Sequence, residues 1–560
     1  MVPALWSDRQ LRICVLFALA LITMEPVGAA SEDHPNVLII LVDDLGFSDL
    51  GAFGGEIDTP NLDALAAEGV RLTDFYTAPT CSPTRAMLLS GTDPHVAGLG
   101  TMAEVVSLKP SLGKVPGYEG YLSHRALSLA EVFRAGGYNT YMSGKWHLGV
   151  EQQQGPHLRG FIRSFALLEG GASHFQPRSD SKLRVENVSY REDGAAVGVP
   201  DDFYSSSFYT QKLIEYIDSG IETGKPFFAY AAYTAPHWPL HAPDELIDKY
   251  SDRYRAGYAA IRAERLLAQE RLGLFPDSTV ALSVLNEAAP LWEALSDEER
   301  DLETKKMAVY AAMVDSLDTS IGRLLQYLRD IGEYDDTIIL FFSDNGAAGE
   351  DHARGYSPNT AREDNSLENI GRRGSNVNYG FRWAEVSAAP FKLVKGTTAE
   401  GGISSPAIMR LPETLLAPGS LLRQVTRVDD LAPTLLELAN VKISPTVVTT
   451  SLPFTGSSLA SQLLGTSPVN RDRILAGELF GQAYVRAGDW KLVSSALPAS
   501  GPPFPSTAYR WQLYDLSVDR GETRDLAADY PDRVANLLLL WETYVTRYGV
   551  VTPDAFKHLE

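Results

Sequence analysis

A repeated order of buried strand followed by helix is the feature that most constrains this fold. The segment Asn36 to Val42 is a continuous apolar run, as expected for a strand covered on both faces of a parallel sheet. Similar runs lie at Asn139 to Met142, Pro226 to Tyr233 and Thr337 to Phe342. Segments with helical periodicity lie between or beside them, at Pro60 to Gly69, Leu129 to Ala135 and Met307 to Leu328. The pattern predicts a doubly wound α/β sheet.

Two stretches interrupt this alternation, and the last part of the chain has a different character. Residues 245–305 are charged and mostly helical in pattern, whereas residues 350–390 are polar and typical of a long loop or lid. After about residue 440 the strand-like runs become short, at Asp489 to Val493 and Trp511 to Asp515. A final helix is expected at Pro531 to Tyr548. We interpret the segment after residue 440 as a smaller α+β domain.

Polar residues gather where the predicted strands end, which is where open α/β sheets bind their ligands. They are Asp43 and Asp44, Lys145 and His147, His237, and Asp344 and Asn345, and Lys395 follows in a glycine-rich segment. Each alone has an ordinary interpretation, since aspartates cap helices, Asp-Asn-Gly is common in turns and a single histidine is usually structural. Together they predict a functional site.

The acidic members of this set indicate a metal. Asp43, Asp44, Asp344 and Asn345 offer three carboxylates and one amide oxygen. Oxygen ligands suit Ca²⁺ or Mg²⁺ better than Zn²⁺, which favours His and Cys. The number of acidic ligands favours Ca²⁺, with Mg²⁺ as the alternative.

Cys81 stands in the segment Cys81-Ser82-Pro83-Thr84-Arg85, and the only other cysteine is Cys14 near the N-terminus. A lone cysteine is usually a small buried hydrophobe. Pro83, however, suits the first turn of a helix, and Arg85 lies four residues after Cys81 on the same helical face. Free backbone N–H groups and a guanidinium at a helix start favour a sulfate or phosphate group.

Cys81-x-Pro83-x-Arg85, followed by an apolar run and Gly91, resembles the first signature of type I sulfatases. The segment from Gly137 to Gly149 resembles the second. The chain resembles bacterial arylsulfatases of this formylglycine-dependent family over nearly all of its length after residue 30. The resemblance implies a large alkaline-phosphatase-like α/β domain with a mixed, mostly parallel sheet sandwiched by helices. It also implies a smaller C-terminal α+β domain with an antiparallel sheet.

The resemblance further implies the chemistry. A formylglycine-generating enzyme would convert Cys81 to formylglycine, whose hydrate attacks the sulfur of a small sulfate ester. An aryl sulfate would yield a phenol and inorganic sulfate. The implied metal ligands are Asp43, Asp44, Cys81 as formylglycine, Asp344 and Asn345. Arg85, Lys145, His147, His237 and Lys395 would surround the sulfate. Asp344 would be the base, His237 (with or without Lys395) the acid, and His147 the base that releases sulfate.

Charge and the N-terminal segment bear on partners and location. The net charge of −22 argues against a nucleic-acid or membrane-surface binder. Arg9 and Arg12 precede the apolar run Ile13 to Thr23, and small residues follow at Val27 to Ala30, which is typical of a secretory signal. That run is too short for a stable membrane anchor, although an uncleaved anchor is the alternative. We therefore expect an exported protein, periplasmic or secreted.

The expected organisation is a signal peptide at 1–30, a catalytic domain at 31–440 and a C-terminal domain at 441–560. Two other functions fit parts of the pattern. A phosphonate monoester or phosphodiester hydrolase of the same superfamily could use similar residues, because fold does not fix function. An exported anion-binding protein without catalysis is the second, but it would need no modifiable cysteine. Trp146, Trp238 and Tyr233 could stack on a substrate ring or pack in the core.

Overall fold

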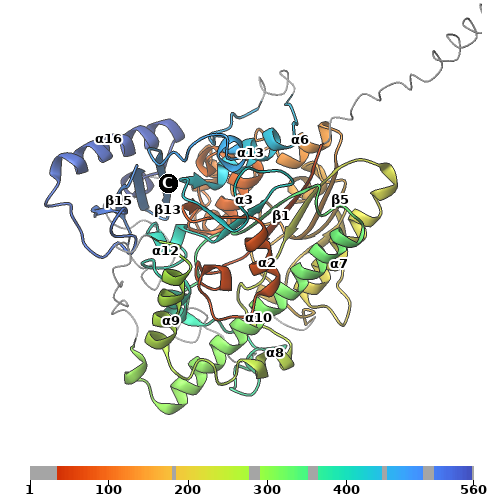
Figure 1. Cartoon of the computed structure of the whole chain (residues 1–560), viewed down its shortest axis with the longest axis horizontal. Coiled ribbons are helices and arrows are strands. Elements are labelled where there is room, and N and C mark those ends of the chain that lie inside the picture. The colour runs from red at the N-terminus through yellow and green to blue at the C-terminus, as the bar shows by residue number, and fades with distance from the viewer. Residues whose placement is uncertain are drawn as a thin grey trace, which may run out of the picture.

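A ten-stranded sheet forms the centre of the computed structural model, which describes residues 34–178, 184–275, 290–350, 363–443, 451–495 and 510–557 (Figure 1). Its strand order is β11-β2-β10-β9-β1-β8-β4-β5-β6-β7. The strands are β1 (Asn36–Val42), β2 (Val70–Leu72), β4 (Asn139–Lys145), β5 (Arg163–Leu167), β6 (Tyr190–Glu192), β7 (Ala195–Val197), β8 (Phe227–Ala232), β9 (Thr337–Ser343), β10 (Ala407–Arg410) and β11 (Ser420–Leu422).

The centre of this sheet is parallel and its two sides are mixed. Strands β9, β1, β8, β4 and β5 pair with one another in parallel, in that order. Antiparallel pairs join β10 to β9 and β2 on one side, and β6 to β5 and β7 on the other, while β11 pairs with β2 in parallel. The predicted mixed, mostly parallel sheet is confirmed. Because the central strands run in one direction, their carboxyl ends share one edge.

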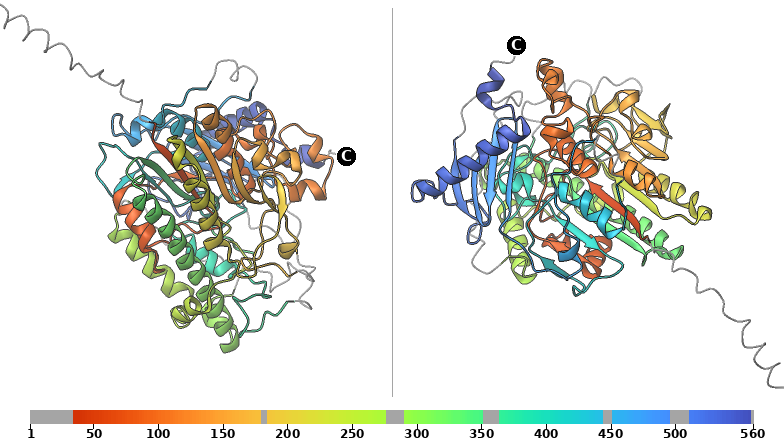
Figure 2. Two further views of the ribbon diagram at one scale, coloured as in Figure 1. Left: turned by 90° about the vertical axis from the view of Figure 1, so that its right-hand side faces the viewer. Right: turned by 90° about the horizontal axis from the view of Figure 1, so that it is seen from above.

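Helices cover both faces of the sheet and create two hydrophobic cores (Figures 1 and 2). Leu38, Ile40 and Val42 of β1 face one core, and the alternate residues Val37, Ile39 and Leu41 face the other. The first core contains residues of α2 (Pro60–Glu68), α7 (Ser205–Asp218) and α10 (Asp297–Asp330). The second contains residues of α3 (Cys81–Ser90), α6 (Leu129–Ala135) and α13 (Leu431–Leu438). Burial on both faces explains why the β1 sequence is continuously apolar.

Helix α10 begins ten residues before the predicted Met307. Ser296 caps it by accepting a hydrogen bond from the Glu299 backbone N–H at 3.2 Å. The Glu299 carboxylate in turn accepts from the Ser296 N–H at 2.8 Å, which completes a capping box. The first turns are polar, so the apolar stripe alone could not reveal them.

A second, smaller sheet lies towards the C-terminus. Strands β13 (Ile474–Leu479), β14 (Gln482–Ala487), β15 (Trp490–Ser494) and β16 (Gln512–Asp515) pair antiparallel in that order. Helix α16 (Pro531–Tyr548) covers one face, with Trp541 packed in a core that includes Val485 and Leu492 (Figure 2, right). The small antiparallel C-terminal part is confirmed. Leu459 and Leu463 still pack in the second core of the large sheet, and the boundary at residue 440 stays a prediction.

Where the structure describes it, the charged stretch 245–305 is largely helical, as predicted, with α8 (Asp244–Lys249) and α9 (Tyr258–Arg271) before α10. Residues 276–289 of this stretch lie outside the described residues. The prediction of a long loop at 350–390 is wrong in part, because α11 (Gly380–Ser387) lies within this stretch. Trp383 and Val386 are fully buried and stabilise this helix through the first core. Residues 351–362 of that stretch lie outside the described residues.

The remaining strands and α-helices of the described chain are short: β3 (Phe75–Tyr76), α4 (Pro94–Ala97), α5 (Ala103–Leu108), α12 (Glu400–Ile403), β12 (Thr426–Arg427), α15 (Ala460–Leu463) and α17 (Pro553–Lys557). The predicted signal peptide at 1–30 lies outside the described residues. In the part of the chain that the structure describes, no helix combines the length and apolar character needed to cross a bilayer.

Candidate active site

The predicted polar residues meet at the carboxyl edge of the parallel strands. Asp43 and Asp44 follow β1, Lys145 ends β4, His237 follows β8, and Asp344 and Asn345 follow β9. The strands β9, β1, β8 and β4 are neighbours in the sheet. The Asp43 N–H donates to the Ala235 carbonyl and the Asp344 N–H donates to the Val42 carbonyl, both at 3.1 Å. These bonds hold the strand ends together.

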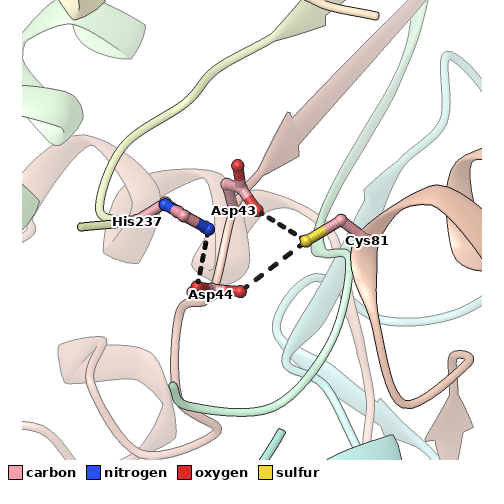
Figure 3. A group of neighbouring side chains, drawn as sticks. All are labelled: Asp43, Asp44, Cys81 and His237. Carbon is pink, nitrogen blue, oxygen red and sulfur yellow. Dashed lines mark hydrogen bonds and ion pairs between the residues drawn. The ribbon is translucent and has the colours of Figure 1, made fainter. Parts of the chain in front are cut away.

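Helix α3 places Cys81 beside the end of β1. All ten of its residues are buried, and it ends before Gly91, whose φ of 61° suits glycine. The Cys81 Sγ lies 3.3 Å from Asp43 Oδ1 and 4.0 Å from Asp44 Oδ1 (Figure 3). Burial, followed by the nearby carboxylates of Asp344 and Asp43, raises the pKa of this thiol well above its usual value. The thiol therefore stays protonated and is a weak nucleophile.

Three ion pairs bring opposite charges together next to Cys81. They are Lys145 Nζ to Asp43 Oδ2 at 2.6 Å, Lys395 Nζ to Asp44 Oδ1 at 2.6 Å, and Arg85 Nη2 to Asp344 Oδ2 at 2.8 Å. Arg85 also donates from Nε to the same Asp344 oxygen at 3.0 Å. Apart from Lys395, whose side chain is 8% exposed, these side chains are fully or almost fully buried. Such pairing is what allows charged groups to remain inside the protein.

Burial and neighbouring charges give two of the carboxyl groups different pKa values. Burial alone would raise the pKa of Asp44, but Lys395 and other cations lower it to about 2. Burial and Asp43 raise the pKa of Asp344 to about 6, despite the opposing effect of Arg85. Asp344 is therefore suited to accept a proton near neutral pH.

Several oxygens at this edge are suited to a divalent cation. The ligand atoms of Asp43, Asp44, Cys81 and His237 lie within 4.8 Å of one another (Figure 3). Asn345 donates from Nδ2 to Asp44 Oδ1 at 2.7 Å, whereas its buried Oδ1 has no hydrogen-bond partner among the described residues. A buried oxygen without a partner is costly, and a hard cation would satisfy it. The donor set fits Ca²⁺ or Mg²⁺, with His237 as a neighbour that the predicted ligand set does not include.

Two histidines flank the carboxylates. His237 Nε2 lies 3.6 Å from Asp44 Oδ2, and its Nδ1 donates to the Trp238 carbonyl at 2.5 Å. His147 has an uncommon positive φ of 54°, and its Nε2 lies 3.3 Å from a Glu104 oxygen. Burial lowers the pKa of both rings, most strongly for His237, while Asp44 and Glu104 act in the opposite direction.

Comparison with known proteins identifies the family. The sequence model of the family described as "Sulfatase" matches residues 35–441. The chain belongs to the sulfatase family. The predicted resemblance is thereby confirmed.

Two curated relatives extend this match over most of the chain. An uncharacterized sulfatase of Schizosaccharomyces pombe is 43% identical over 545 residues, which cover 94% of this chain and 96% of the relative. An arylsulfatase of Klebsiella aerogenes is 39% identical over 452 residues, covering 79% of this chain and 95% of the relative. The solved PsFucS1 sulfatase from Pseudoalteromonas sp. superposes with a TM-score of 0.62 at 20% identity, covering 97% and 95% of the two chains. The alkaline-phosphatase-like sulfatase fold is confirmed.

The candidate site contains residues that the sequence did not reveal. Glu104 of α5 pairs with His147, and the Tyr230 hydroxyl of β8 accepts a hydrogen bond from Arg85 Nη1 at 3.4 Å. Burial raises the pKa of Glu350, and Lys395 acts against this rise. The Oε2 atom of Glu350 is buried and has no hydrogen-bond partner among the described residues. None of these stands in a recognisable motif.

The three aromatic residues near the site differ in exposure. Trp146 and Tyr233 are 0% and 1% exposed, so they pack in the core. Trp238 is partly exposed and stacks obliquely beside His237, with 5.0 Å between ring centroids. Of the three, only Trp238 is accessible to a substrate ring.

Proposed function

We propose that this sulfatase hydrolyses small aryl sulfate esters to a phenol and inorganic sulfate, with a formylglycine at position 81 and a divalent cation. Family membership supports sulfuric ester hydrolysis, and the Klebsiella aerogenes arylsulfatase supports the aryl class. The observation that carries the proposal is the position of Cys81. It opens a buried helix, lies 3.3 Å from a carboxylate, and is surrounded by three cations that an anionic substrate requires.

The thiol at 81 is best explained as a precursor. Its pKa is raised by burial and by Asp344 and Asp43, so the unmodified side chain is a poor nucleophile. Formylglycine supplies, as its hydrate, one hydroxyl for attack on sulfur and a second for release of sulfate. Since Cys81 is only 2% exposed, we expect the formylglycine-generating enzyme to act before this part of the chain folds.

Charge balance supports both the metal and the anionic substrate. Arg85, Lys145 and Lys395 compensate the three aspartates one for one. Because these charges already balance, a divalent cation at Asp43, Asp44, Asp344, Asn345 and residue 81 would leave a local excess of positive charge. The two histidines add nothing to it, since burial lowers their pKa and leaves them neutral. A bound sulfate group would offset that excess. We favour Ca²⁺, with Mg²⁺ as the alternative, and the metal would supply a positive charge that polarises the sulfate oxygens.

The remaining residues divide the proton transfers. Asp344, whose pKa burial and Asp43 raise to about 6 before any cation is bound, accepts the proton of the attacking hydroxyl. His237 donates to the departing phenol oxygen, and an anionic substrate would favour its protonated form. Lys395, close to Asp44, can assist this step. His147 accepts the proton when sulfate is released, and Glu104 orients its ring.

We also propose the expected organisation and location. Residues 1–30 would be a signal peptide, 31–440 the catalytic domain and 441–560 the C-terminal domain. The protein would be exported, periplasmic or secreted, with no nucleic-acid partner and no stable membrane anchor. The leader pattern between Arg9 and Ala30 and the net charge of −22 support this.

Relative turnover separates sulfate ester hydrolysis from its nearest alternative. The purified enzyme should hydrolyse an aryl sulfate with a kcat/KM at least about tenfold higher than that for an aryl phosphodiester or phosphonate monoester with the same phenol. The shared phenol controls for leaving-group reactivity. A preference for either phosphorus substrate would assign the chain to the other activity, and no turnover of any of them would favour the binding protein.

Mass spectrometry of the peptide containing residue 81 tests the modification. Conversion of Cys81 removes sulfur and two hydrogens and adds one oxygen, so the peptide mass should fall by roughly 18 Da. The matched variant Cys81→Ser should lack this change and lack sustained turnover, because serine has no second hydroxyl for release. Full activity with an unmodified thiol would contradict the mechanism.

Rapid-quench kinetics distinguish the two histidines. His147→Ala should give a burst of phenol, then slow turnover with ³⁵S retained on the protein, because only sulfate release is impaired. His237→Ala should show no burst, and its defect should grow as the phenol becomes more basic. The exposed His124→Ala is the control and should match the wild type. If both variants show the same burst and leaving-group dependence, their separate roles are wrong.

A further inference from the structure

A second cluster of charged residues lies where the four-stranded sheet meets the large sheet. It surrounds a cavity of about 170 Å³, here named the arginine pocket. Its lining includes Asp74, Phe275, Arg423, Arg471, Asp489 and Arg520. Asp74 precedes β3 and Arg423 lies between β11 and β12, whereas Asp489 lies between β14 and β15 and Arg520 follows β16. The proposed catalytic residues are not among its lining residues.

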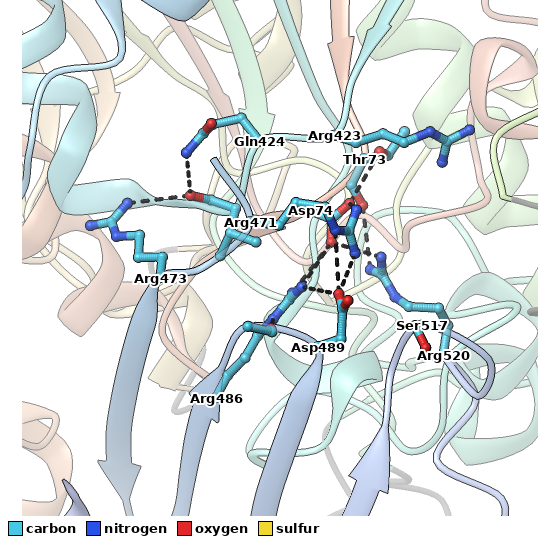
Figure 4. Close-up of polar contacts among 12 residues, drawn as sticks. Thr73, Asp74, Arg423, Gln424, Arg471, Arg473, Arg486, Asp489, Ser517 and Arg520 are labelled. Atoms are coloured by element: carbon cyan, nitrogen blue, oxygen red, sulfur yellow. Dashed lines mark hydrogen bonds and ion pairs between the residues drawn. The ribbon is translucent and has the colours of Figure 1, made fainter. Parts of the chain in front are cut away.

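Asp74 is the centre of this cluster and is shared by several guanidinium groups (Figure 4). Its Oδ1 accepts from Arg520 Nη1 at 2.9 Å and from Arg486 Nη1 and Nη2 at 3.3 Å. Arg471 Nη1 lies 3.8 Å from Oδ2. Burial would raise the pKa of Asp74, but these arginines lower it below the usual value. Asp74 therefore stays anionic and compensates only one of its cationic neighbours.

The cluster has more positive than negative charge. Arg471, Arg486 and Arg520 contact Asp74 or Asp489 (Figure 4), and Arg423 lines the same pocket as a fourth arginine. The Asp489 carboxylate is already bound to Arg471 at 2.7 Å. Glu400 lies 3.5 Å from Arg520, but it pairs with Lys491 at 2.9 Å, as does Glu522. With this lysine and both glutamates included, one positive charge remains uncompensated. Such an excess is notable in a chain whose net charge is −22.

Arg423 has no carboxylate within ion-pair distance in the described part of the chain. It donates instead to the carbonyls of Leu274 at 2.8 Å and Gly273 at 2.9 Å. Burial lowers its pKa, Asp74 opposes this, and Arg471 and Arg520 lower it further. A guanidinium has five N–H donors, so Arg423 retains donors beyond these two bonds.

Arg520 also has an unused donor. Its Nε is buried and has no hydrogen-bond partner among the described residues. The guanidinium lies 5.6 Å from the ring centroid of Phe275 and 5.3 Å from that of Phe391, which holds it in place. The group is therefore fixed, charged and incompletely satisfied.

We propose that the arginine pocket binds a small tetrahedral oxyanion, sulfate or phosphate, at a site separate from the catalytic one. Guanidinium groups match the geometry of such anions through paired N–H donors. The cavity of about 170 Å³ has room for one anion and accompanying waters, at roughly 30 Å³ per water. Because its lining comes from segments of both sheets, a bound anion stabilises the contact between them.

Equilibrium dialysis of the full-length holoenzyme against ³⁵S-sulfate or ³²P-phosphate tests this, at constant ionic strength set with chloride. We expect the wild type to bind one sulfate at the catalytic site and a second in the pocket. Arg423→Glu should lose the second, because the new charge repels the anion, and Arg423→Gln should weaken it by about tenfold or more. The anion with the lower dissociation constant at the second site is assigned as its ligand.

Two controls are needed: one for the effect of an arginine substitution on the fold, and one that distinguishes the pocket from the catalytic site. Arg300→Gln also removes bonds to two backbone carbonyls, those of Trp292 and Glu293, and should bind both anions like the wild type. The competitive inhibition of aryl sulfate turnover by sulfate should be unchanged in Arg423→Gln. If Arg423→Glu does not fold, the dialysis result for Arg423→Gln tests the proposal by itself. Single-site binding by the wild type, unchanged binding by Arg423→Gln, or a parallel change in inhibition would overturn the proposal.

Discussion

The burial of charge at the carboxyl edge of the sheet is the constraint on which the site depends. An unpaired charge there would cost several kcal/mol, so each cation must lie against an acid. Asp43, Asp44 and Asp344 meet this requirement with a lysine or arginine each. The pairs link three separate strand ends, the helix that begins at Cys81 and the segment of Lys395. The ion pairs that balance the charges of the site therefore also hold the loops after the strands in place.

The fold was largely predictable because buried segments have recognisable patterns of apolar residues in the sequence. Strand β1 and helices α6 and α16 have the predicted bounds. The buried apolar run sets the bounds of β1, whereas α6 ends before Gly136 and α16 begins at Pro531 and ends before Gly549. The start of α10 and the whole of α11 were not predicted. The first turns of α10 are polar, and α11 is short and depends on the tertiary burial of Trp383.

The candidate site was predictable where topology brings residues together. Asp43 and Asp344 follow neighbouring parallel strands, so their side chains meet at one edge. The presence of Glu104 and Glu350 in the site could not be predicted in this way, because each belongs to a segment whose position depends on the completed fold. The arginine pocket is similar, since residues as distant as Asp74 and Arg520 form it. No local sequence pattern predicts contacts of this kind.

The central claim is that the buried carboxylates of this sulfatase hold a divalent cation that turnover requires. The most direct measurement is the calcium and magnesium content of the purified enzyme, with turnover recorded before chelation, after it and after metal is returned. We expect about one equivalent in the wild type and in Asp335→Ala, whose carboxylate is 94% exposed, and loss of metal and turnover in Asp344→Ala. Chelation should abolish wild-type turnover and returned metal should restore it. Wild-type turnover by a fully demetallated enzyme would contradict the account.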